Sequence, residues 1–318
     1  MTSENIMPID PTNNDRVLIL LSTYNGEQYL EMQLDSLRDQ SYKNFEVVAR
    51  DDGSTDKSRE ILTRYGITVI SSDANVGIEG SFGLLLEHTL KHTDCRYFMF
   101  CDQDDVWQRN KIEQTLIKMK KMESSDGNIP LLVHTDLEVV DENLKMIAPS
   151  FLQYQHLDHN KNSFNRLLLQ NTITGCTMMI NRSLAEKALP LPENVMMHDW
   201  WMGLVASCFG KIGFIDEQTI LYRQHDNNSI GAQRPSFVEA IFKSGYFARQ
   251  RSLLDQCSRQ ADTFLKSYEK SLDAEAVEIL LAFSHIKDFS YLKRRWILWR
   301  YALFKQGWLR NIALFLII

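Results

Sequence analysis

The stretch Phe98-Met99-Phe100-Cys101-Asp102-Gln103-Asp104-Asp105-Val106-Trp107 carries the strongest structural signal of this sequence. Four apolar residues lead directly into three carboxylates, which is the pattern of a buried strand that ends in a loop. Carboxylates this close together repel one another unless a cation lies between them. Mg²⁺ and Mn²⁺ prefer oxygen ligands and often join carboxylates to a substrate diphosphate. An acidic loop that caps the next helix is the alternative, because Asp is common at helix N-caps.

A strand followed by a helix recurs throughout the sequence that surrounds this stretch. Apolar runs predict strands at 17–21, 45–49, 68–70 and 97–101, and helical spacing of apolar residues predicts helices at 30–40, 81–92 and 111–122, with a more polar helix around 61–62. This alternation predicts an α/β fold with a mostly parallel sheet flanked by helices. Ligands bind beyond the carboxyl ends of such strands. The loops at 22–26, 50–54 and 101–105 should therefore converge on one crevice.

The pattern changes after Gly127. Short strands are predicted at 131–133, 137–140, 177–180 and 219–223, with a buried helix at 200–208. From residue 237 onward only helices are predicted. We therefore expect a flexible tail over 1–15, an α/β domain over 16–235 and a helical region over 236–318.

Composition restricts the partners of the chain. With 318 residues and 44% hydrophobic content, the chain can bury a large core. A formal net charge of -6 argues against nucleic acid as a partner. The five cysteines form no C-x-x-C pair, so reduced thiols in the cytosol are expected. The sequence contains no stretch of about 18 apolar residues that predicts a membrane-spanning helix.

The last segment, 291–318, contains six basic residues and neither Asp nor Glu. The steps between its apolar residues are four, three and four, which predicts one helix face formed by Leu292, Trp296, Trp299 and Leu303. Aromatic and basic residues on an amphipathic helix suit an anionic membrane surface. A helix that packs against the rest of the chain, or a contact between copies in an oligomer, is the alternative.

Three loop motifs, in this order, resemble the family 2 glycosyltransferases of the Rossmann-like GT-A fold, and most of all the bacterial rhamnosyltransferase-like group. The motifs are Ser22-Thr23-Tyr24-Asn25-Gly26, Asp51-Asp52-Gly53-Ser54-Thr55-Asp56 and Asp102-Gln103-Asp104-Asp105. The resemblance covers about residues 16–230. It implies metal-dependent, inverting transfer of a hexosyl or deoxyhexosyl unit from a nucleoside diphosphate sugar. The expected donor is dTDP-L-rhamnose, and the expected acceptor is a bacterial cell-surface polysaccharide or a lipid-linked glycan.

The resemblance also assigns donor-binding residues, namely Thr23, Tyr24, Asn25, Asp52, Asn75, Gly77 and Asp102. The first three would hold the nucleotide base, and Asp52 would accept a hydrogen bond from the N–H of a pyrimidine ring. A carboxylate cannot distinguish uracil from thymine, so UDP-sugars remain possible donors. Asn75 and Gly77 would lie over the donor, and Asp102 would contact the ribose or the outer shell of the metal. Ordinary turns, with Asp52 as a helix-capping residue, are the alternative.

The resemblance assigns the chemistry to three further residues. Asp104 matches the family's ligand for Mn²⁺ or Mg²⁺, with Asp105 beside it, and His225 resembles another ligand from the far side of the site. Asp199 matches the general base that takes a proton from the acceptor hydroxyl. The alternatives are a structural histidine and an Asp199 that caps a helix with buried tryptophans. Residues 174–176 could pass close to the acceptor, but we expect them to serve packing instead, and residues 227–229 are expected to cover the diphosphate.

Two other classes of protein share part of this pattern. A sugar-phosphate nucleotidyltransferase normally has a Gly-rich, basic loop after its first strand, whereas residues 22–26 contain neither Lys nor Arg. A catalytically silent sugar-nucleotide-binding subunit would need neither the full set of carboxylates nor Asp199. The implied location is cytoplasmic and peripheral at the inner face of the cell membrane, where a lipid-linked acceptor would be met.

Overall fold

The computed structural model describes residues 15–318 except 72–73, 194 and 226–244. The strands are β1 (Val17–Thr23), β2 (Phe45–Asp51), β3 (Thr68–Ser71), β4 (Tyr97–Cys101), β5 (Val106–Trp107), β6 (Leu131–Val140), β7 (Met146–Ala148), β8 (Met179–Asn181) and β9 (Lys211–Arg223). The helices of the first part are α1 (Leu30–Arg38), α2 (Ser58–Arg64), α3 (Gly77–His92), α4 (Lys111–Asp126), α5 (Phe151–Tyr154), α6 (Phe164–Leu167), α7 (Arg182–Ala188) and α8 (His198–Phe209). The later helices are α10 (Tyr246–Tyr268), α11 (Ala274–Ser284), α12 (Tyr291–Arg300) and α13 (Trp308–Ile317), and short 3₁₀ turns lie at Gly175–Thr177 and Ile286–Asp288.

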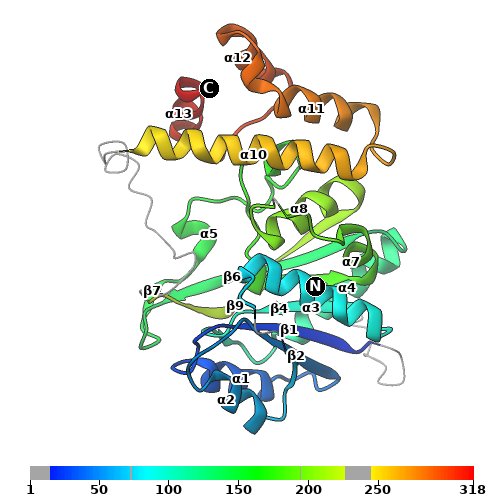
Figure 1. The fold of residues 1–318 in the computed structure, drawn as a ribbon, viewed down its shortest axis with the longest axis vertical. Helices are drawn as coiled ribbons and strands as arrows, with labels where there is room; N and C mark the ends of the chain where they lie inside the picture. The colour runs from blue at the N-terminus through cyan, green and yellow to red at the C-terminus, as the bar shows by residue number, and fades with distance from the viewer. Residues whose placement is uncertain (1–14, 72–73, 194, 226–244) are drawn as a thin grey trace, which may run out of the picture.

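In the described part of the chain, the strands form one sheet in the order β3-β2-β1-β4-β8-β6-β9-β5, and β7 pairs with β6 (Figure 1). The first four strands of this order are parallel, as the sequence predicts. Because β1 lies between β2 and β4, the loops that follow these three strands meet at one edge of the sheet. The predicted α/β fold with helices on both faces is confirmed.

Alternate residues of the central strands serve two separate apolar cores. On one face, β1 and β4 pack against α3, α7 and α8; on the other, the same strands pack against α1, α2 and α4. Residues 17–20 are fully buried because both faces of the strand are covered, which explains why the strand is a continuous apolar run.

Strand β6 differs from the prediction of two short strands. It is continuous from Leu131 to Val140, and its polar residues His134, Thr135 and Asp136 are buried. The Asp136 carboxylate accepts hydrogen bonds from the backbone N–H of Leu137 (2.8 Å) and Leu152 (3.2 Å) and from the Ser150 hydroxyl. These partners satisfy the hydrogen bonds of the buried carboxylate. The strand therefore continues through a polar stretch at which the sequence predicts a break.

The C-terminal helices share a core with the α/β part of the chain. The Trp201 ring of α8 lies 5.3 Å from the Phe264 ring of α10 and 5.9 Å from the Tyr268 ring. Figure 1 shows α10 crossing the molecule above α8, with α11, α12 and α13 beyond it. None of the helices among the described residues is both long and apolar enough to cross a bilayer.

Both predicted domain boundaries lie in or next to segments that the structure does not describe. Residues 1–14 of the expected tail lie outside them, whereas Asp15 is buried and forms an ion pair with Lys120 (2.5 Å). The predicted division after residue 235 lies within the undescribed segment 226–244, as do residues 227–229.

Candidate active site

The three predicted loops are joined by direct hydrogen bonds. The Gln103 side chain of the acidic loop accepts from the Tyr24 N–H (2.8 Å) and donates to the Tyr24 carbonyl (3.0 Å). The Asn25 side chain accepts from the Thr55 N–H (2.9 Å), and the Asn25 N–H donates to the Ser54 hydroxyl (2.9 Å). The predicted convergence of these loops is therefore confirmed.

The residues of the first loop differ in whether their side chains are free to bind a nucleotide. Thr23 is buried, and its hydroxyl donates to Asp51 (3.2 Å). The side-chain oxygen of Asn25 is occupied by Thr55. Tyr24 is exposed, so its ring is the group of this loop that can contact a base.

Asp52 is buried at the start of α3. Its Oδ1 accepts from the Arg50 guanidinium and from the Val76 N–H (2.9 Å), and its Oδ2 accepts from the Gly77 N–H (2.9 Å). These bonds begin α3 at Gly77, four residues before the predicted start. Each carboxylate oxygen can accept about two hydrogen bonds, so Oδ2 retains capacity for one donor such as a pyrimidine N–H.

The loop that precedes α3 is exposed and held by Asp52. The Asn75 side chain accepts from the Gly77 N–H (3.2 Å), which gives it a local role in the turn. Gly77 has a φ of 75°, a conformation that favours glycine. Gly77 is bonded to Asp52 of the second loop, and the expected contact of Asn75 and Gly77 with the donor stays a prediction.

The acidic loop and the end of β9 meet at Asp104 and His225. The His225 Nε2 lies 2.9 Å from Asp104 Oδ2, although the two residues are far apart in sequence. Arg223 fixes the loop, because its Nε donates to the Asp104 carbonyl (2.8 Å) and its backbone N–H donates to Asp105 (3.2 Å). The Tyr29 ring stacks on His225 at 4.7 Å. The two predicted metal ligands are thus brought together, with Arg223 and Tyr29 as supports.

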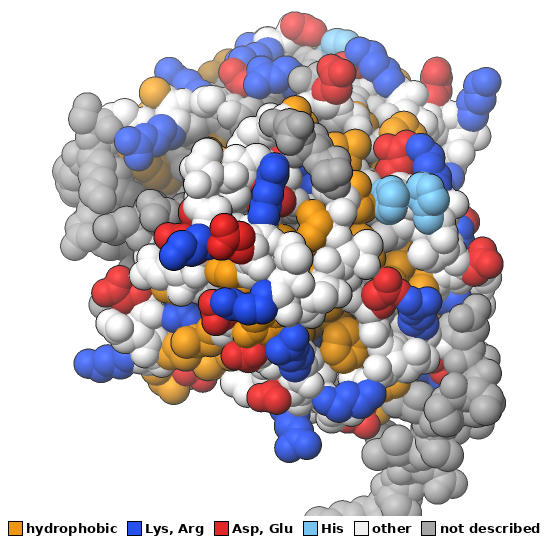
Figure 2. Space-filling model, turned by 60° about the horizontal axis from the view of Figure 1, so that its bottom comes forward, with side chains coloured by type: hydrophobic (Ala, Val, Ile, Leu, Met, Phe, Trp, Pro, Cys, Tyr) orange, Lys and Arg blue, Asp and Glu red, His pale blue; other side chains and the backbone are white. Residues whose placement is uncertain are grey.

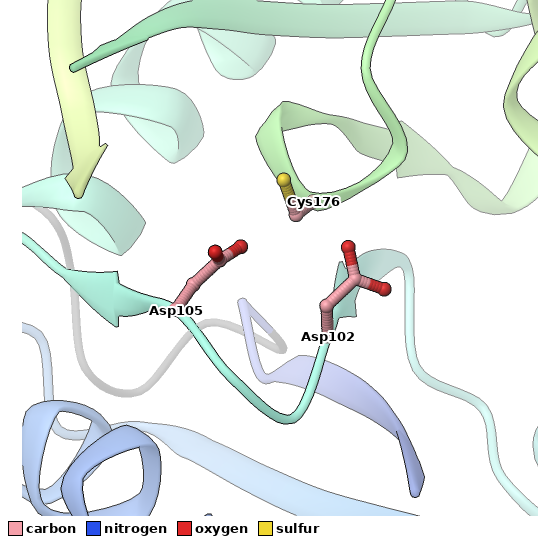
Figure 3. Close-up of side chains that lie close together, drawn as sticks. All are labelled: Asp102, Asp105 and Cys176. Carbon is pink, nitrogen blue, oxygen red and sulfur yellow. The ribbon is translucent and has the colours of Figure 1, made fainter. Parts of the chain in front are cut away.

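Figure 3 shows Asp102 and Asp105 pointing toward Cys176, which descends from the 3₁₀ turn at 175–177. Ligand atoms of these three residues lie within 4.8 Å of one another. Burial raises the pKa of both Asp105 and Cys176 well above their ordinary values. Burial, together with the negative charges of Asp104 and Asp199, raises the pKa of Asp102 to about 7. Cys176 is buried and packs as predicted, with its thiol close to the carboxylates of Asp102 and Asp105.

The acidic loop fits a hard divalent cation. One Asp105 oxygen is buried without a hydrogen-bond partner, and among the described residues no Lys or Arg side chain forms an ion pair with Asp102 or Asp104. Carboxylates at this density, without a Lys or Arg ion pair, attract a cation. Oxygen ligands and an imidazole suit Mn²⁺ or Mg²⁺ better than the neutral, buried thiol of Cys176 does. Asp102, Asp104 and His225 are therefore the residues of this chain that could hold the ion.

Asp199 lies in the first turn of α8, after the N-cap Met197. Its carboxylate accepts from the Gly175 N–H (2.9 Å) and from the Asn171 amide (3.0 Å). Burial raises its pKa to about 7, although hydrogen bonds from backbone N–H groups and Asn171 oppose the rise. Because its charge also raises the pKa of Asp102, Asp199 lies in the same electrostatic field as the acidic loop. The arrangement provides a carboxylate poised to accept a proton near neutral pH.

The backbone of Gly175 can approach Asp199 closely enough to hydrogen-bond its carboxylate because glycine has no side chain. A Cβ there would lie 2.8 Å from His198 Nε2 and 3.6 Å from Asp199 Cβ. The His198 ring has little room to move, since it packs 4.4 Å from the Phe82 ring and 5.2 Å from the Phe100 ring.

We expect Gly175→Ala to displace the start of α8, to lower the free energy of unfolding by about 1–3 kcal/mol and to lower turnover at least about tenfold. Thermal melts and donor turnover measure the two effects. Gly83→Ala is the matched control, because the nearest atoms to its Cβ would belong to Leu191, at 3.0 Å, and not to His198 or Asp199. Equal loss of turnover in the two variants would contradict a positioning role for Gly175.

The sheet, the three joined loops and the buried carboxylate at a helix start define a fold of the GT-A glycosyltransferase class. The solved structure of S. aureus TarS 1–349 in complex with UDP-GlcNAc has a TM-score of 0.55 at 17% identity, over 87% of this chain and 74% of that chain. The mannosyltransferase PcManGT from Pyrobaculum calidifontis, in complex with GDP-Man and Mn²⁺, has a TM-score of 0.50 at 18% identity, over 92% and 74%. The family model described as Glycosyl transferase family 2 matches residues 18–189, and the chain belongs to that family.

Several relatives are similar over much of the chain. The dTDP-rhamnosyl transferase RfbG of Shigella flexneri is 27% identical over 234 residues, which is 67% of this chain and 74% of that protein. A UDP-Glc:alpha-D-GlcNAc-diphosphoundecaprenol beta-1,3-glucosyltransferase of Escherichia coli, WfgD, is 29% identical over 169 residues, or 53% and 61%. An uncharacterized glycosyltransferase of Rickettsia typhi is 28% identical over 220 residues, and the match spans 68% of this chain and 66% of that protein.

Proposed function

We propose that the chain is a metal-dependent, inverting glycosyltransferase that moves a sugar from a nucleoside diphosphate to a hydroxyl of a bacterial polysaccharide or lipid-linked glycan. The observation that carries this proposal is Asp199, a buried carboxylate held by Gly175 and Asn171 in the electrostatic field of the acidic loop. Membership of glycosyl transferase family 2 supports the reaction class.

Asp199 accepts the proton of the acceptor hydroxyl as the hydroxyl oxygen attacks the anomeric carbon of the donor sugar. The bond between that carbon and the diphosphate oxygen breaks, and the electron pair leaves with the nucleoside diphosphate. A single displacement inverts the anomeric centre, so the protein supplies no nucleophile. Asp102, Asp104 and His225 would hold Mn²⁺ or Mg²⁺, and the bound ion would neutralise charge on the leaving diphosphate.

The expected donor is dTDP-L-rhamnose. Support comes from RfbG, whose name specifies a dTDP-rhamnosyl transferase. A UDP-sugar is the second candidate, because WfgD and TarS carry UDP-sugars in their names or titles. In both cases the proposed base recognition is the same, with the Tyr24 ring against the pyrimidine and Asp52 Oδ2 accepting its N–H.

Thermal melts with a panel of nucleotide sugars in Mn²⁺ test the choice of donor. A donor present at about 100 times its Kd raises the free energy of unfolding by about 2.7 kcal/mol. We expect dTDP-L-rhamnose to give the largest rise and GDP-mannose the smallest. A larger rise with a UDP-sugar would favour the second candidate, and an equal rise with GDP-mannose would contradict pyrimidine recognition by Asp52.

We also propose that the enzyme acts at the cytoplasmic face of the cell membrane as a peripheral protein. The diphosphoundecaprenol acceptor in the name of WfgD supports a lipid-linked acceptor for this chain. An acceptor anchored in a bilayer is reached only by an enzyme that works close to the membrane surface.

A further inference from the structure

The two last helices of the chain expose an unusual amount of apolar surface. On α12 and α13, six large side chains are between 51% and 76% exposed, namely Tyr291, Leu292, Trp296, Trp299, Trp308 and Leu316, which we call the aromatic surface. Large apolar side chains that gather on a folded protein indicate an interaction site. Leu303, which the sequence predicts on this face, is fully buried, because α12 ends at Arg300 and the chain turns at Ala302.

The aromatic surface is held in a fixed position by the core. Side chains on the opposite sides of α12 and α13 are buried in the core that also contains α8 and α10, among them Ile297, Leu298, Leu314 and Ile318. The helices are also joined to each other, because Arg294 donates to the Ile318 carbonyl (3.4 Å) and Arg295 to the Phe315 carbonyl (2.5 Å). Deleting residues 291–318 would therefore open the core, so single side chains must be changed instead.

The basic charge of residues 291–318 indicates which kind of partner the aromatic surface would bind. No acidic residue lies within 291–318, and Lys293 and Arg300 are exposed beside the exposed tryptophans. Two other basic residues are turned inward, with Lys305 donating to the Gln250 side chain (3.0 Å) and Arg310 to the Gln155 carbonyl (2.8 Å). Figure 2, which brings the end with α1 and α2 forward, shows basic and acidic side chains interspersed on that face. Residues 291–318 therefore carry a single sign of charge, although Glu278 of α11 lies against them and accepts from the Tyr301 hydroxyl (2.5 Å).

This charge favours a lipid surface over a second copy of the chain. In a two-fold symmetric contact the two aromatic surfaces would face each other, which would bring Lys293 and Arg300 of both copies into one interface with no carboxylate of residues 291–318 to balance them. Anionic headgroups instead attract these cations, while tryptophan rings lie well at the level of the headgroups. Figure 1 places α12 and α13 beyond α10, at the end of the molecule away from α1 and α2.

We propose that the aromatic surface docks the enzyme on an anionic lipid bilayer, with Trp296, Trp299 and Trp308 inserted at the headgroup level and Lys293 and Arg300 against the anionic headgroups. The docking deepens the proposed function, since it rests on an acceptor that is lipid-linked. It would hold the enzyme on the membrane without a spanning helix.

Sedimentation of the full chain with vesicles tests the proposal. Vesicles of phosphatidylcholine alone are compared with vesicles that contain equal parts of phosphatidylcholine and phosphatidylglycerol. We expect binding to the anionic vesicles, weakened at least tenfold by Trp299→Ala combined with Trp308→Ala. Lys293→Gln with Arg300→Gln should remove most of the preference for phosphatidylglycerol. The matched control is Met146→Ala with Ile147→Ala, since these exposed apolar residues lie on β7.

Three results would overturn the docking proposal. The full chain could fail to sediment with anionic vesicles at low salt, or the β7 control could lose as much binding as the tryptophan variant. The tryptophan variant could also bind vesicles normally while converting a dimer to a monomer, which would assign the surface to an oligomer contact. Without vesicles, the tryptophan variant should turn over the donor as fast as the wild type does. This assay tests the proposed reaction independently of docking.

Discussion

Replacing Asp199 with Asn is expected to lower turnover by about 10²–10⁴ while donor affinity survives, because the amide keeps the shape but cannot accept a proton. Asp199 accepts hydrogen bonds from both Gly175 and Asn171, and an Asn side chain can accept with only one of its two end atoms. A modest loss of stability should accompany the loss of turnover, and thermal melts measure it. The control is Asp262→Asn on α10, which removes only a surface ion pair with Lys266.

The pH dependence of kcat/KM is a second test of Asp199. Burial raises the pKa of Asp199 to about 7, so the carboxylate is protonated below that pH and able to act as a base above it. The value of kcat/KM should therefore rise with pH through about 7 in the wild type, and this rise should be absent from the residual activity of Asp199→Asn. If donor binding falls as much as turnover in that variant, Asp199 is a binding or structural residue instead.

The second large effect is expected at Asp104. Its Oδ2 lies 2.9 Å from His225 Nε2, and its carboxylate has no Lys or Arg ion pair among the residues that the structure describes. Asp104→Asn should abolish Mn²⁺-dependent donor binding with the fold intact, as measured by titration calorimetry with nucleotide in Mn²⁺ and in EDTA. His225→Ala should weaken the metal dependence less, because it removes one ligand of several.

The same Asp262→Asn variant serves as the control for these two substitutions, since it changes an Asp to Asn far from the acidic loop. Mn²⁺-dependent turnover retained by Asp104→Asn would overturn the assignment of Asp104 as a metal ligand. An equal loss in His225→Ala and Asp104→Asn would instead indicate that the contact between the two side chains is what matters.

The first half of the fold was predictable because its strands are buried on both faces. Residues 17–20 form a continuous apolar run for that reason, and the parallel order then brings the following loops to one edge. The second half was harder to predict. Polar residues interrupt the apolar pattern of β6 at His134 to Asp136, and partners distant in sequence, such as Leu152, help to satisfy the buried Asp136 carboxylate.

The sequence indicated which carboxylates and which histidine would meet in the candidate site, but not the residues that support them. Asp104, Asp199 and His225 stand out by type and position, whereas Gln103, Arg223 and Asn171 act through contacts with residues distant in sequence. Nothing in the local pattern marks such partners, because a Gln or Asn in a loop is common. The position of Gly175 against His198 likewise depends on tertiary contact, which spacing in the sequence does not report.

The most direct test of the account is hydrolysis of the donor that gives the largest thermal stabilisation, in which water takes the place of the acceptor hydroxyl and nucleoside diphosphate is released. It is measured for the wild type and for Asp199→Asn, each in Mn²⁺ and in EDTA. The account predicts release by the wild type in Mn²⁺, loss of that release in EDTA, and release lowered by about 10² or more in the variant. Donor binding without release by the wild type would contradict it and would identify a silent sugar-nucleotide-binding subunit, and equal release by both proteins would remove Asp199 from the chemistry.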